Sequence, residues 1–475
     1  MFQLRRIAPV ALALFLPAIF PAVQATAQTA TPLAPEVTAR IDAAAKKELA
    51  ATGVPSASVA VVRHGQIVYV HAYGKARLDP PLAATPAMQY SIGSVSKQFT
   101  AAAMLLMQEQ GKLKLDDPVS KYLPELTRAN EVTLRMLLSH TSGYQDFWPE
   151  DYVMTSMQAP TTAQHILDVW GRKPLDFDPG TRWQYSNTNY VIAGRIVELV
   201  SGQKLMDLLA VRVFKPLGMT GVLNQDAARL PSTDPIGYYR HALGPLRPSP
   251  LEGFGWMFAA GELAMPARDL ALWNISLMER SLLQPASYDE MFREVKLKDG
   301  KGTGYGLGVE IGDRNGHRVI SHSGEVSGFV SMNTVYPDDK AAVTVLTNED
   351  ASSAAGAIAK DLDGILLAPV GAPGDAKTEA RALAIFTGLQ NGQLDRSQLT
   401  PYCDAYFSPE AITDFASSLK PLGTPTEFKQ VNEEQRGGMT FRVFHAKFPK
   451  RTVVVTTYEM PDGKLEQYLV IPTTS

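Results

Sequence analysis

The apolar and polar residues of this chain recur with two different periods, which predict helices and strands in turn. Between residues 36 and 52 the apolar positions have helical spacing, and Gly53 follows at the place typical of a helix C-terminal cap. The runs 58–63 and 66–73 are rich in β-branched and aromatic residues and are joined by a His-Gly pair. This pattern predicts a helix followed by a β-hairpin.

Helical spacing dominates the middle of the chain, and strands return only late. From residue 94 to about residue 290 the pattern is mostly helical, with long loops rich in Pro and Gly. Short β-branched runs follow at 317–324, 328–337 and 341–349. Because strands lie at both ends of this region, we expect an α/β (α+β) fold in which one sheet is assembled from the two ends and covered by helices on both faces.

The last hundred residues have a pattern of their own. Residues 369–377 belong to a stretch with the composition of a linker. We therefore expect a main domain over 36–368 and a small α+β domain over 378–475, which resembles cystatin-like or nuclear-transport-factor-like folds. Three helical segments are predicted at 378–390, 396–405 and 409–419, and four strands at 426–432, 439–448, 452–460 and 464–471.

The first 27 residues have the pattern of a secretory signal peptide. Arg5 and Arg6 precede an apolar stretch over 7–20, and the small residues Ala-Thr-Ala end the segment at 25–27. The apolar stretch is short and contains prolines, whereas a membrane-spanning helix needs about 20 residues. We expect a periplasmic or secreted protein with no stable membrane insertion after signal removal; an uncleaved anchor is the alternative.

Composition removes several classes of function. The 475 residues carry a formal charge of −3 and no long basic run, so the basic surface expected of a nucleic-acid-binding protein is missing. Cys403 is the one cysteine, which excludes a disulfide framework and a thiol-ligated metal site. No two of the eight histidines stand three or four residues apart, so we expect neither a metal nor another cofactor.

Ser94 and Lys97 stand three residues apart where a predicted helix begins, so their side chains can meet. A serine becomes a good nucleophile when a neighbouring base takes its proton. For Lys97 to be that base, its usual pKa of about 10.4 must fall close to neutrality. The N–H groups at the helix start could then stabilise the oxyanion of an attacked ester or amide. By itself this spacing also arises by chance, with the serine as a helix cap.

Two further short motifs follow in the chain. Tyr185 and Asn187 precede an apolar-periodic helix, and the triplet 322–324 (His-Ser-Gly) lies at the end of a predicted strand. Taken in order with Ser94 and Lys97, these motifs resemble the serine β-lactamase and penicillin-binding-protein superfamily. The similarity is to the branch that contains class C β-lactamases, DD-carboxypeptidases, D-aminopeptidases and esterases, whose sheet is antiparallel. Supporting stretches lie at 137–144, 216–219 and 304–311.

The resemblance implies a role for each of the first four residues. Ser94 is expected to attack the substrate and to carry the acyl group. Lys97 and Tyr185 are expected to move the proton, and the resemblance leaves open which of them is the principal base. A cationic Lys97 would favour the charged form of the Tyr185 phenol. Asn187 is expected to orient Lys97 and to bind the acyl amide of the substrate.

The resemblance also implies a substrate-binding strand. His322 and Ser323 are expected to face the substrate, with His322 able to receive a carboxylate only when protonated. Gly324 is expected to let the substrate backbone approach the strand. The backbone N–H groups of Ser94 and Glu325 would form the oxyanion hole, and the Glu325 carboxylate could receive a substrate amine. His322 stands where the family's motif has lysine, which weakens the case for β-lactamase activity.

Several of these residues have a plainer structural interpretation. Tyr185 could be a packed aromatic side chain, Asn187 a turn residue, and His322 a strand histidine with a structural partner. His140 and Ser142 imitate a serine–histidine pair, but their setting predicts a turn that ends a helix.

We expect an exported serine hydrolase that works through an acyl-enzyme on Ser94. Its substrates would be D-amino-acid-containing peptides, as for a DD-carboxypeptidase or D-aminopeptidase, or small esters. One alternative is a penicillin- or cell-wall-binding receptor with little turnover, and another is a class C-like β-lactamase. The expected partners are a small-molecule or peptide substrate, with peptidoglycan fragments among the candidates, and no nucleic acid; the sequence does not indicate an oligomeric state.

Overall fold

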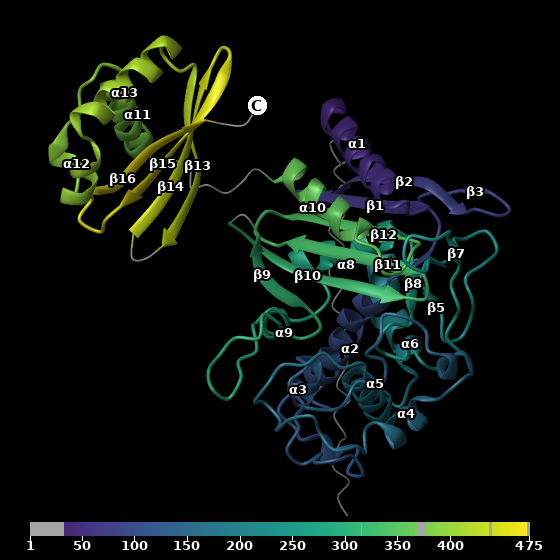
Figure 1. Cartoon of the computed structure of the whole chain (residues 1–475). Helices are drawn as coiled ribbons and strands as arrows, with labels where there is room; N and C mark the ends of the chain where they lie inside the picture. The colour runs from purple at the N-terminus through teal and green to yellow at the C-terminus, as the bar shows by residue number, and fades with distance from the viewer. Residues whose placement is uncertain (1–32, 315, 368–375, 437–438, 473–475) are drawn as a thin grey trace, which may run out of the picture. The chain divides into compact units, whose positions relative to one another are not determined.

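A computed structural model describes residues 33–314, 316–367, 376–436 and 439–472 (Figure 1). The predicted signal peptide at 1–27 lies outside the described residues, as does most of the predicted linker at 369–377. Within the described ranges no helix is both long enough and apolar enough to cross a lipid bilayer.

The first elements are those that the sequence predicts. Helix α1 (Pro35–Thr52) ends at Gly53, which has a φ of 77° and donates its N–H to Leu49 O. Strands β1 (Ser56–Arg63) and β2 (Gln66–Arg77) then pair as an antiparallel hairpin. Gly53 is favoured there because its left-handed backbone is costly for residues with a Cβ atom.

The main sheet joins strands from the two ends of the predicted main domain. The sheet is antiparallel, and β1 pairs with β12 so that Val59 lies opposite Val345. This arrangement confirms the predicted fold class, while β3 and β9 were not predicted as strands. The strand order is β3 (Leu82–Ala83), β2, β1, β12 (Ala341–Thr347), β11 (Phe329–Tyr336), β10 (His317–Val326) and β9 (Glu310–Arg314).

Helices cover both faces of this sheet, as Figure 1 shows. Helices α1 and α10 (Ala354–Leu366) pack on one face, and α8 (Ala267–Glu279) packs on the other. On β1, Val59 belongs to the apolar cluster under α1 and α10, whereas Val62 belongs to the large cluster on the opposite face. Burial on both faces explains why β1 is apolar at nearly every position.

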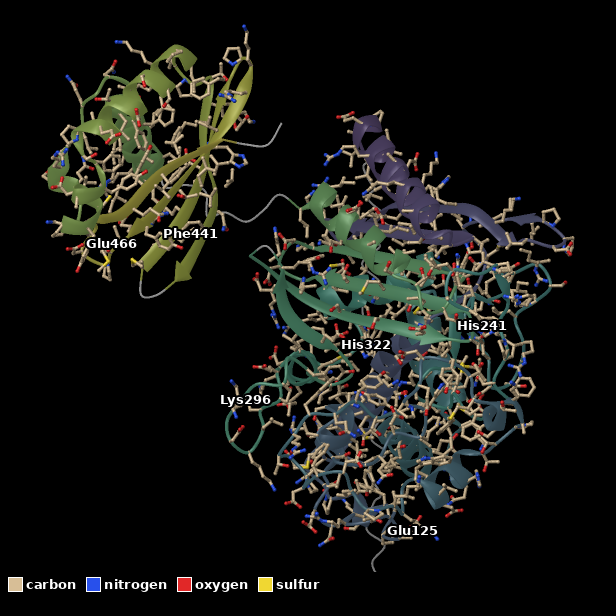
Figure 2. All side chains as sticks on the ribbon, in the orientation of Figure 1. Glu125, His241, Lys296, His322, Phe441 and Glu466 are labelled. Carbon is tan, nitrogen blue, oxygen red and sulfur yellow. The ribbon has the colours of Figure 1, made fainter. Side chains whose placement is uncertain are left out.

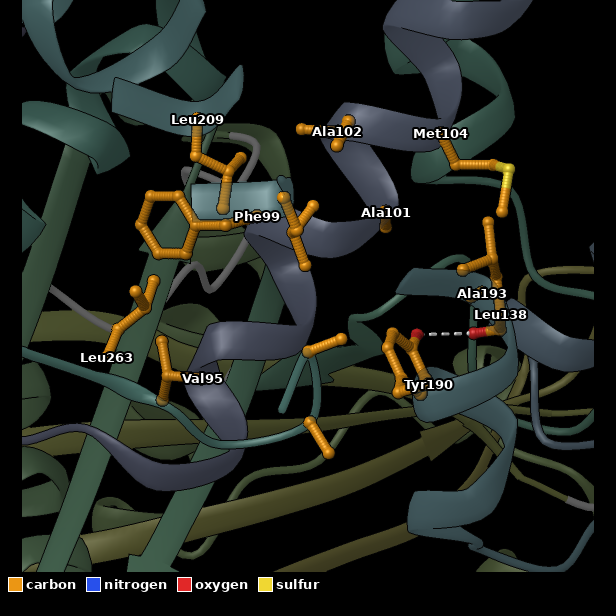
Figure 3. Close-up of a cluster of buried hydrophobic side chains, with 14 of the residues drawn as sticks. Val95, Phe99, Ala101, Ala102, Met104, Leu138, Tyr190, Ala193, Leu209 and Leu263 are labelled. Carbon is orange, nitrogen blue, oxygen red and sulfur yellow. Dashed lines mark hydrogen bonds between the residues drawn. The ribbon is translucent and has the colours of Figure 1, made fainter. Parts of the chain in front are cut away.

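Helix α2 (Lys97–Glu109) runs through the largest apolar cluster, and every residue from Lys97 to Met107 is buried. Figure 3 shows Phe99 and Leu209 in this cluster, and Tyr190, whose hydroxyl donates to Leu138 O over 2.8 Å. A helix that is apolar on all sides belongs in a core. Consequently the first residue of α2, Lys97, is carried into the interior of the protein.

Six further α-helices and five short strands belong to this part of the described chain. The helices are α3 (Leu134–Leu138), α4 (Ala163–Val169), α5 (Asn187–Ser201), α6 (Leu205–Leu209), α7 (Lys215–Leu217) and α9 (Pro285–Met291). The short strands are β4 (Tyr90–Ser91), β5 (Leu223–Asn224), β6 (Tyr238–Tyr239), β7 (Arg247–Pro248) and β8 (Leu263–Met265).

A 3-10 turn, η1 (Gly93–Ser96), precedes α2 and lies against β10 with almost no space between the two backbones. A Cβ atom on Gly324 would lie 2.0 Å from Ile92 O, and one on Gly93 would lie 2.6 Å from Glu325 N. The expected reason for Gly324 was the approach of a substrate. The structure gives a different one, because the backbone carbonyl of Ile92 already occupies the place of its Cβ.

The C-terminal elements form a second sheet with its own apolar cluster. Strands β13 (Glu427–Arg436), β14 (Met439–Phe448), β15 (Arg451–Glu459) and β16 (Leu465–Pro472) form an antiparallel meander in chain order. The helices are α11 (Ala376–Gln390), α12 (Pro401–Tyr406) and α13 (Pro409–Leu419), and the predicted helix at 396–405 is split into a 3-10 turn and α12. Phe386, Phe444 and Tyr468 lie in the cluster. The domain boundaries and the cystatin-like or nuclear-transport-factor-like resemblance stay predictions.

Because η1 and β10 are in close contact, adding one methyl group at Gly324 is expected to destabilise the protein. We expect Gly324→Ala to lower the free energy of unfolding by about 1–3 kcal/mol, because either η1 or β10 must move. Gly312→Ala on β9 is the matched control, since a Cβ atom there would meet Val319 at an ordinary 3.7 Å. Urea unfolding of both variants measures the difference, and equal midpoints would contradict the tight contact.

Candidate active site

A cleft of about 530 Å³ opens where η1, β10 and the loop before α5 meet. Figure 2 labels His322, which lies on β10. Lys97 lies under the floor of the cleft, with no exposed surface. The other candidate residues all line the cleft: Ser94, Tyr185, Asn187, His322, Ser323, Gly324 and Glu325.

The Lys97 amine makes three contacts with oxygen atoms. Its Nζ lies 2.9 Å from Ser94 Oγ, 2.8 Å from Asn187 Oδ1 and 2.8 Å from the backbone oxygen of Ala260. Burial lowers the pKa of Lys97 to about 7, against the opposing effect of the Asp146 carboxylate. Near neutral pH a large fraction of the amine is therefore uncharged.

These contacts determine where an uncharged amine can take up a proton. The carbonyl oxygens of Asn187 and Ala260 can only accept hydrogen bonds, so they use both N–H groups of the neutral amine. The lone pair is left for the third neighbour, the Ser94 hydroxyl. Ser94 Oγ–H can then donate to Lys97 Nζ, which is the arrangement that a general base requires.

Asn187 is fixed by an acid that the sequence analysis missed. Its Nδ2 lies 3.2 Å from each carboxylate oxygen of Asp146, and its backbone N–H donates to Asp146 Oδ1 over 3.0 Å. Burial raises the pKa of Asp146. Because Asp146 binds the amide nitrogen, the amide oxygen must point to Lys97. Asn187 therefore positions Lys97, and its amide is already engaged rather than free for the substrate.

The loop before β8 carries the second acceptor of Lys97. Ala259 has a φ of 57°, and its N–H donates to the buried carboxyl of Glu262 over 3.3 Å. Asp226 accepts the N–H of Gly255 over 2.9 Å in the same loop. Burial raises the pKa of Glu262 to about 8 and that of Asp226 to about 6. The carboxyl groups of Glu262 and Asp226 thus hold the loop that presents Ala260 O.

Tyr185 is half-buried beside Lys97, and its hydroxyl oxygen is fully buried. The centroid of its ring lies 4.9 Å from Lys97 Nζ and 4.3 Å from the centroid of the His140 ring. Burial raises the pKa of Tyr185 well above 10, although the neighbouring Ser94 hydroxyl lowers it, and Asp146 and Glu310 raise it further. The expectation that a cationic lysine favours the phenolate is therefore not met. Tyr185 keeps its proton and can donate it.

His322 is held as a neutral ring. Its Nδ1 lies 2.5 Å from Ser323 O, which only accepts, so Nδ1 carries the hydrogen and Nε2 accepts from Tyr305 Oη over 2.7 Å. Burial, together with the nearby Lys97, lowers the pKa of His322 to about 4. At neutral pH the histidine therefore offers no positive charge to a carboxylate. Tyr305 was missed as a partner, although the stretch 304–311 was noted.

One edge of β10 is open at the cleft. Strand β9 pairs with β10 only up to Ser321, so Ser323 and Glu325 lie beyond the end of their neighbour on that side. Glu325 N lies next to Gly93, and hence close to the turn that holds Ser94. The backbone N–H groups of Ser94 and Glu325 can therefore face one substrate oxygen atom. The unpaired edge of β10 can in addition bind a substrate backbone as a further strand.

The wall of the cleft is acidic. No lysine or arginine lines it among the described residues. Burial raises the pKa of Glu325, whose carboxylate accepts the N–H of Ala351 over 2.6 Å, and raises that of Asp350 to about 6. The carboxylate side chains that line the cleft are Asp146, Glu150, Asp151, Glu310, Glu325 and Asp350.

The apparent pair of His140 and Ser142 is structural. His140 has a φ of 59° and its Nδ1 accepts the N–H of Ser186 over 3.1 Å, whereas Ser142 Oγ donates to Asn189. Burial lowers the pKa of His140 well below 6.5.

The described residues hold no group of three or more acidic, histidine or cysteine side chains that could bind a metal ion.

Comparison with known proteins gives a consistent result. Residues 41–368 match the family model described as Beta-lactamase. Penicillin-binding protein 4* of Bacillus subtilis (strain 168) is 29% identical over 312 residues, which are 62% of this chain and 68% of that protein. A D-aminopeptidase of Brucella canis is 29% identical over 314 residues, which are 64% of this chain but only 58% of that enzyme.

Solved structures show the same fold. A D-stereospecific amidohydrolase from Streptomyces sp. has a TM-score of 0.59 at 26% identity, and the match covers 68% of this chain and 98% of that one. The D-amino acid amidase from Ochrobactrum anthropi SV3, complexed with L-phenylalanine, has a TM-score of 0.61 at 26% identity, over 70% and 97% of the two chains.

The pKa of Lys97 predicts how acylation depends on pH. Below about pH 7 the amine is protonated and cannot take the proton of Ser94, so the acylation rate is expected to rise through about pH 7 and then level off. Lys97→Arg keeps a permanent charge and should slow acylation about 10²–10⁴-fold. The exposed Lys112 just after α2 provides the control, Lys112→Arg. Stopped-flow release of p-nitrophenol from an activated ester measures both effects, and a profile that is flat from pH 5 to 9 would contradict this role.

Proposed function

The chain belongs to the beta-lactamase family. On this premise we propose that it is a serine hydrolase in which Ser94 takes up an acyl group. The proposed substrates are D-amino-acid amides or peptides that carry a free amine in the acyl part. The general assignment as a serine hydrolase follows from the relatives of this chain. They include D-aminopeptidases, D-amino acid amidases and penicillin-binding proteins. The choice of substrate is the proposal.

The acidic wall of the cleft is the observation that carries this choice. Six carboxylate side chains and no lysine or arginine line it among the described residues. A negative field attracts a substrate ammonium group and repels a terminal carboxylate. The neutral His322 supports the same choice, because no positive charge faces the cleft at the place where the family's motif has lysine. This argues against a β-lactam or a free C-terminal D-alanine as the preferred substrate.

Aromatic side chains supply the apolar part of the proposed recognition. They can cover the side chain of an amino acid while the carboxylates bind its amine. The aromatic residues that line the cleft are Phe147, Trp148, Tyr152, Trp183, Tyr185 and Trp256.

In the proposed mechanism, Ser94 Oγ attacks the carbonyl carbon while neutral Lys97 takes the hydroxyl proton. The backbone N–H groups of Ser94 and Glu325 receive the oxyanion. Tyr185 then donates its proton to the leaving nitrogen and regains one from the Lys97 ammonium, so that the C–N bond breaks and the acyl-enzyme remains. Water hydrolyses the ester with Lys97 again as the base, and the proton returns to Ser94.

We also propose that the protein is exported, on the strength of the pattern in residues 1–27. A DD-carboxypeptidase, an esterase or a penicillin-binding receptor with little turnover are the other outcomes that an assay can return. The similarity to penicillin-binding protein 4* supports them, whereas the charge of the cleft favours an amine-bearing substrate.

A matched pair of substrates tests the proposal. We expect kcat/KM for D-phenylalaninamide to exceed that for N-acetyl-D-phenylalaninamide at least tenfold, since the acetyl group removes the ammonium charge that the cleft attracts. Ser94→Ala should abolish turnover of both, and Glu325→Gln should reduce the ratio between them. Equal turnover of the two amides, or turnover confined to acylated D-alanyl-D-alanine, would overturn the substrate assignment.

A further inference from the structure

A second cavity adjoins the catalytic cleft. Its volume is about 170 Å³, and Ser327 lines both this cavity and the cleft. Ser249, which lines the second cavity, also donates a hydrogen bond of 3.3 Å to Asp350, which lines the cleft. Most of the second cavity is apolar, with walls formed by Leu230, Pro235, Ile236, Pro248, Leu251 and Phe329.

Two polar atoms in this cavity are buried without a partner. Glu252 is 2% exposed and Ser327 is 7% exposed, and neither Glu252 Oε2 nor Ser327 Oγ makes a hydrogen bond among the described residues. Nearly all buried polar atoms in proteins are hydrogen-bonded, because leaving one unpaired costs free energy. Burial raises the pKa of Glu252 to about 7. Above that pH its carboxylate oxygen can only be satisfied by a donor, so the cavity then fits a group that carries N–H or O–H.

Two arginine side chains, Arg77 and Arg229, also line this cavity, but they do not pair with Glu252 Oε2. Arg229 donates to the backbone oxygen of Glu252 over 2.7 Å and stacks on the ring of Phe254. Arg77 donates to backbone oxygens of Pro231 and Asp234. Both guanidinium groups are thus engaged by other oxygens, and the Glu252 carboxylate forms no ion pair within the described residues.

The position of the cavity along β10 shows which part of a substrate could reach it. Ser327 follows Glu325 by two residues, on the side away from His322. At about 3.3 Å per residue, this is at most about 7 Å beyond the proposed oxyanion donor. An acyl chain that lies along the open edge of β10 and is longer than one amino acid would therefore reach Ser327, which lines both cavities.

We propose that this cavity is a subsite for the amino end of a substrate whose acyl part is two residues long, with Glu252 Oε2 and Ser327 Oγ receiving its N–H groups. The apolar walls and the volume fit a small side chain such as that of alanine. This inference rests on the proposed function, because Ser94 must attack the second residue of such a substrate, and it specifies the length of the acyl part.

Binding to the Ser94→Ala variant tests the subsite without requiring turnover. Two ligands of equal length are compared by calorimetry, alanyl-D-alaninamide and N-propionyl-D-alaninamide, which differ only in the terminal amine. We expect the amine to improve affinity about tenfold, as one hydrogen bond between charged groups does. Adding Glu252→Gln should remove this advantage and leave the affinity for D-alaninamide unchanged.

Ser327→Ala provides a second test if Glu252→Gln does not fold. We expect it to weaken the binding of alanyl-D-alaninamide about threefold relative to that of D-alaninamide. Equal affinity for the two ligands would overturn the inference, since water would then satisfy Glu252. An advantage that survives Glu252→Gln would overturn it too, because the acids of the main cleft would then bind the amine. Hydrolysis of D-phenylalaninamide by the wild-type enzyme is a separate result, so the proposed function and the subsite can fail independently.

Discussion

One buried amine constrains the arrangement of the whole cleft. Lys97 has no exposed surface, and two carbonyl oxygens, Asn187 Oδ1 and Ala260 O, lie 2.8 Å from its nitrogen. Neither oxygen can donate, so the two contacts direct the lone pair of the neutral amine toward Ser94. Helices α2 and α5 and the loop before β8 supply these atoms. The activation of Ser94 therefore depends on three segments that are far apart in the sequence keeping their relative positions.

Burial away from water determines the pKa values, and hence the charges, of the ionisable groups in the site. Burial lowers the pKa of Lys97 to about 7 and that of His322 to about 4, and it raises the pKa of Tyr185. Near and above neutral pH the resting site therefore holds a largely neutral amine, a neutral imidazole and a protonated phenol. The remaining charge is the negative charge of the acids on the cleft wall, so the charge that fits an incoming substrate is positive.

Local patterns in the sequence were sufficient for the long strands other than β9, for most helices and for the proximity of Ser94 and Lys97, because these depend on neighbours within one turn or one hairpin. The partners of Lys97 that come from elsewhere were not predictable in this way. Ala260 contributes a backbone oxygen, which any residue has, and Asp146 lies 41 residues before the asparagine that it orients. The protonation state of Tyr185 was misjudged, and the low pKa of His322 was not foreseen, because both depend mainly on burial, which no short motif encodes.

The protonation of Lys97 itself is the most direct test of this account. With ¹³C-labelled lysine, the Cε resonance of Lys97 can be assigned as the signal that disappears in Lys97→Arg and can then be followed from pH 5 to 11. The account predicts a midpoint near 7, because burial favours the neutral amine. A midpoint near 10, as for an ordinary exposed lysine, would contradict it.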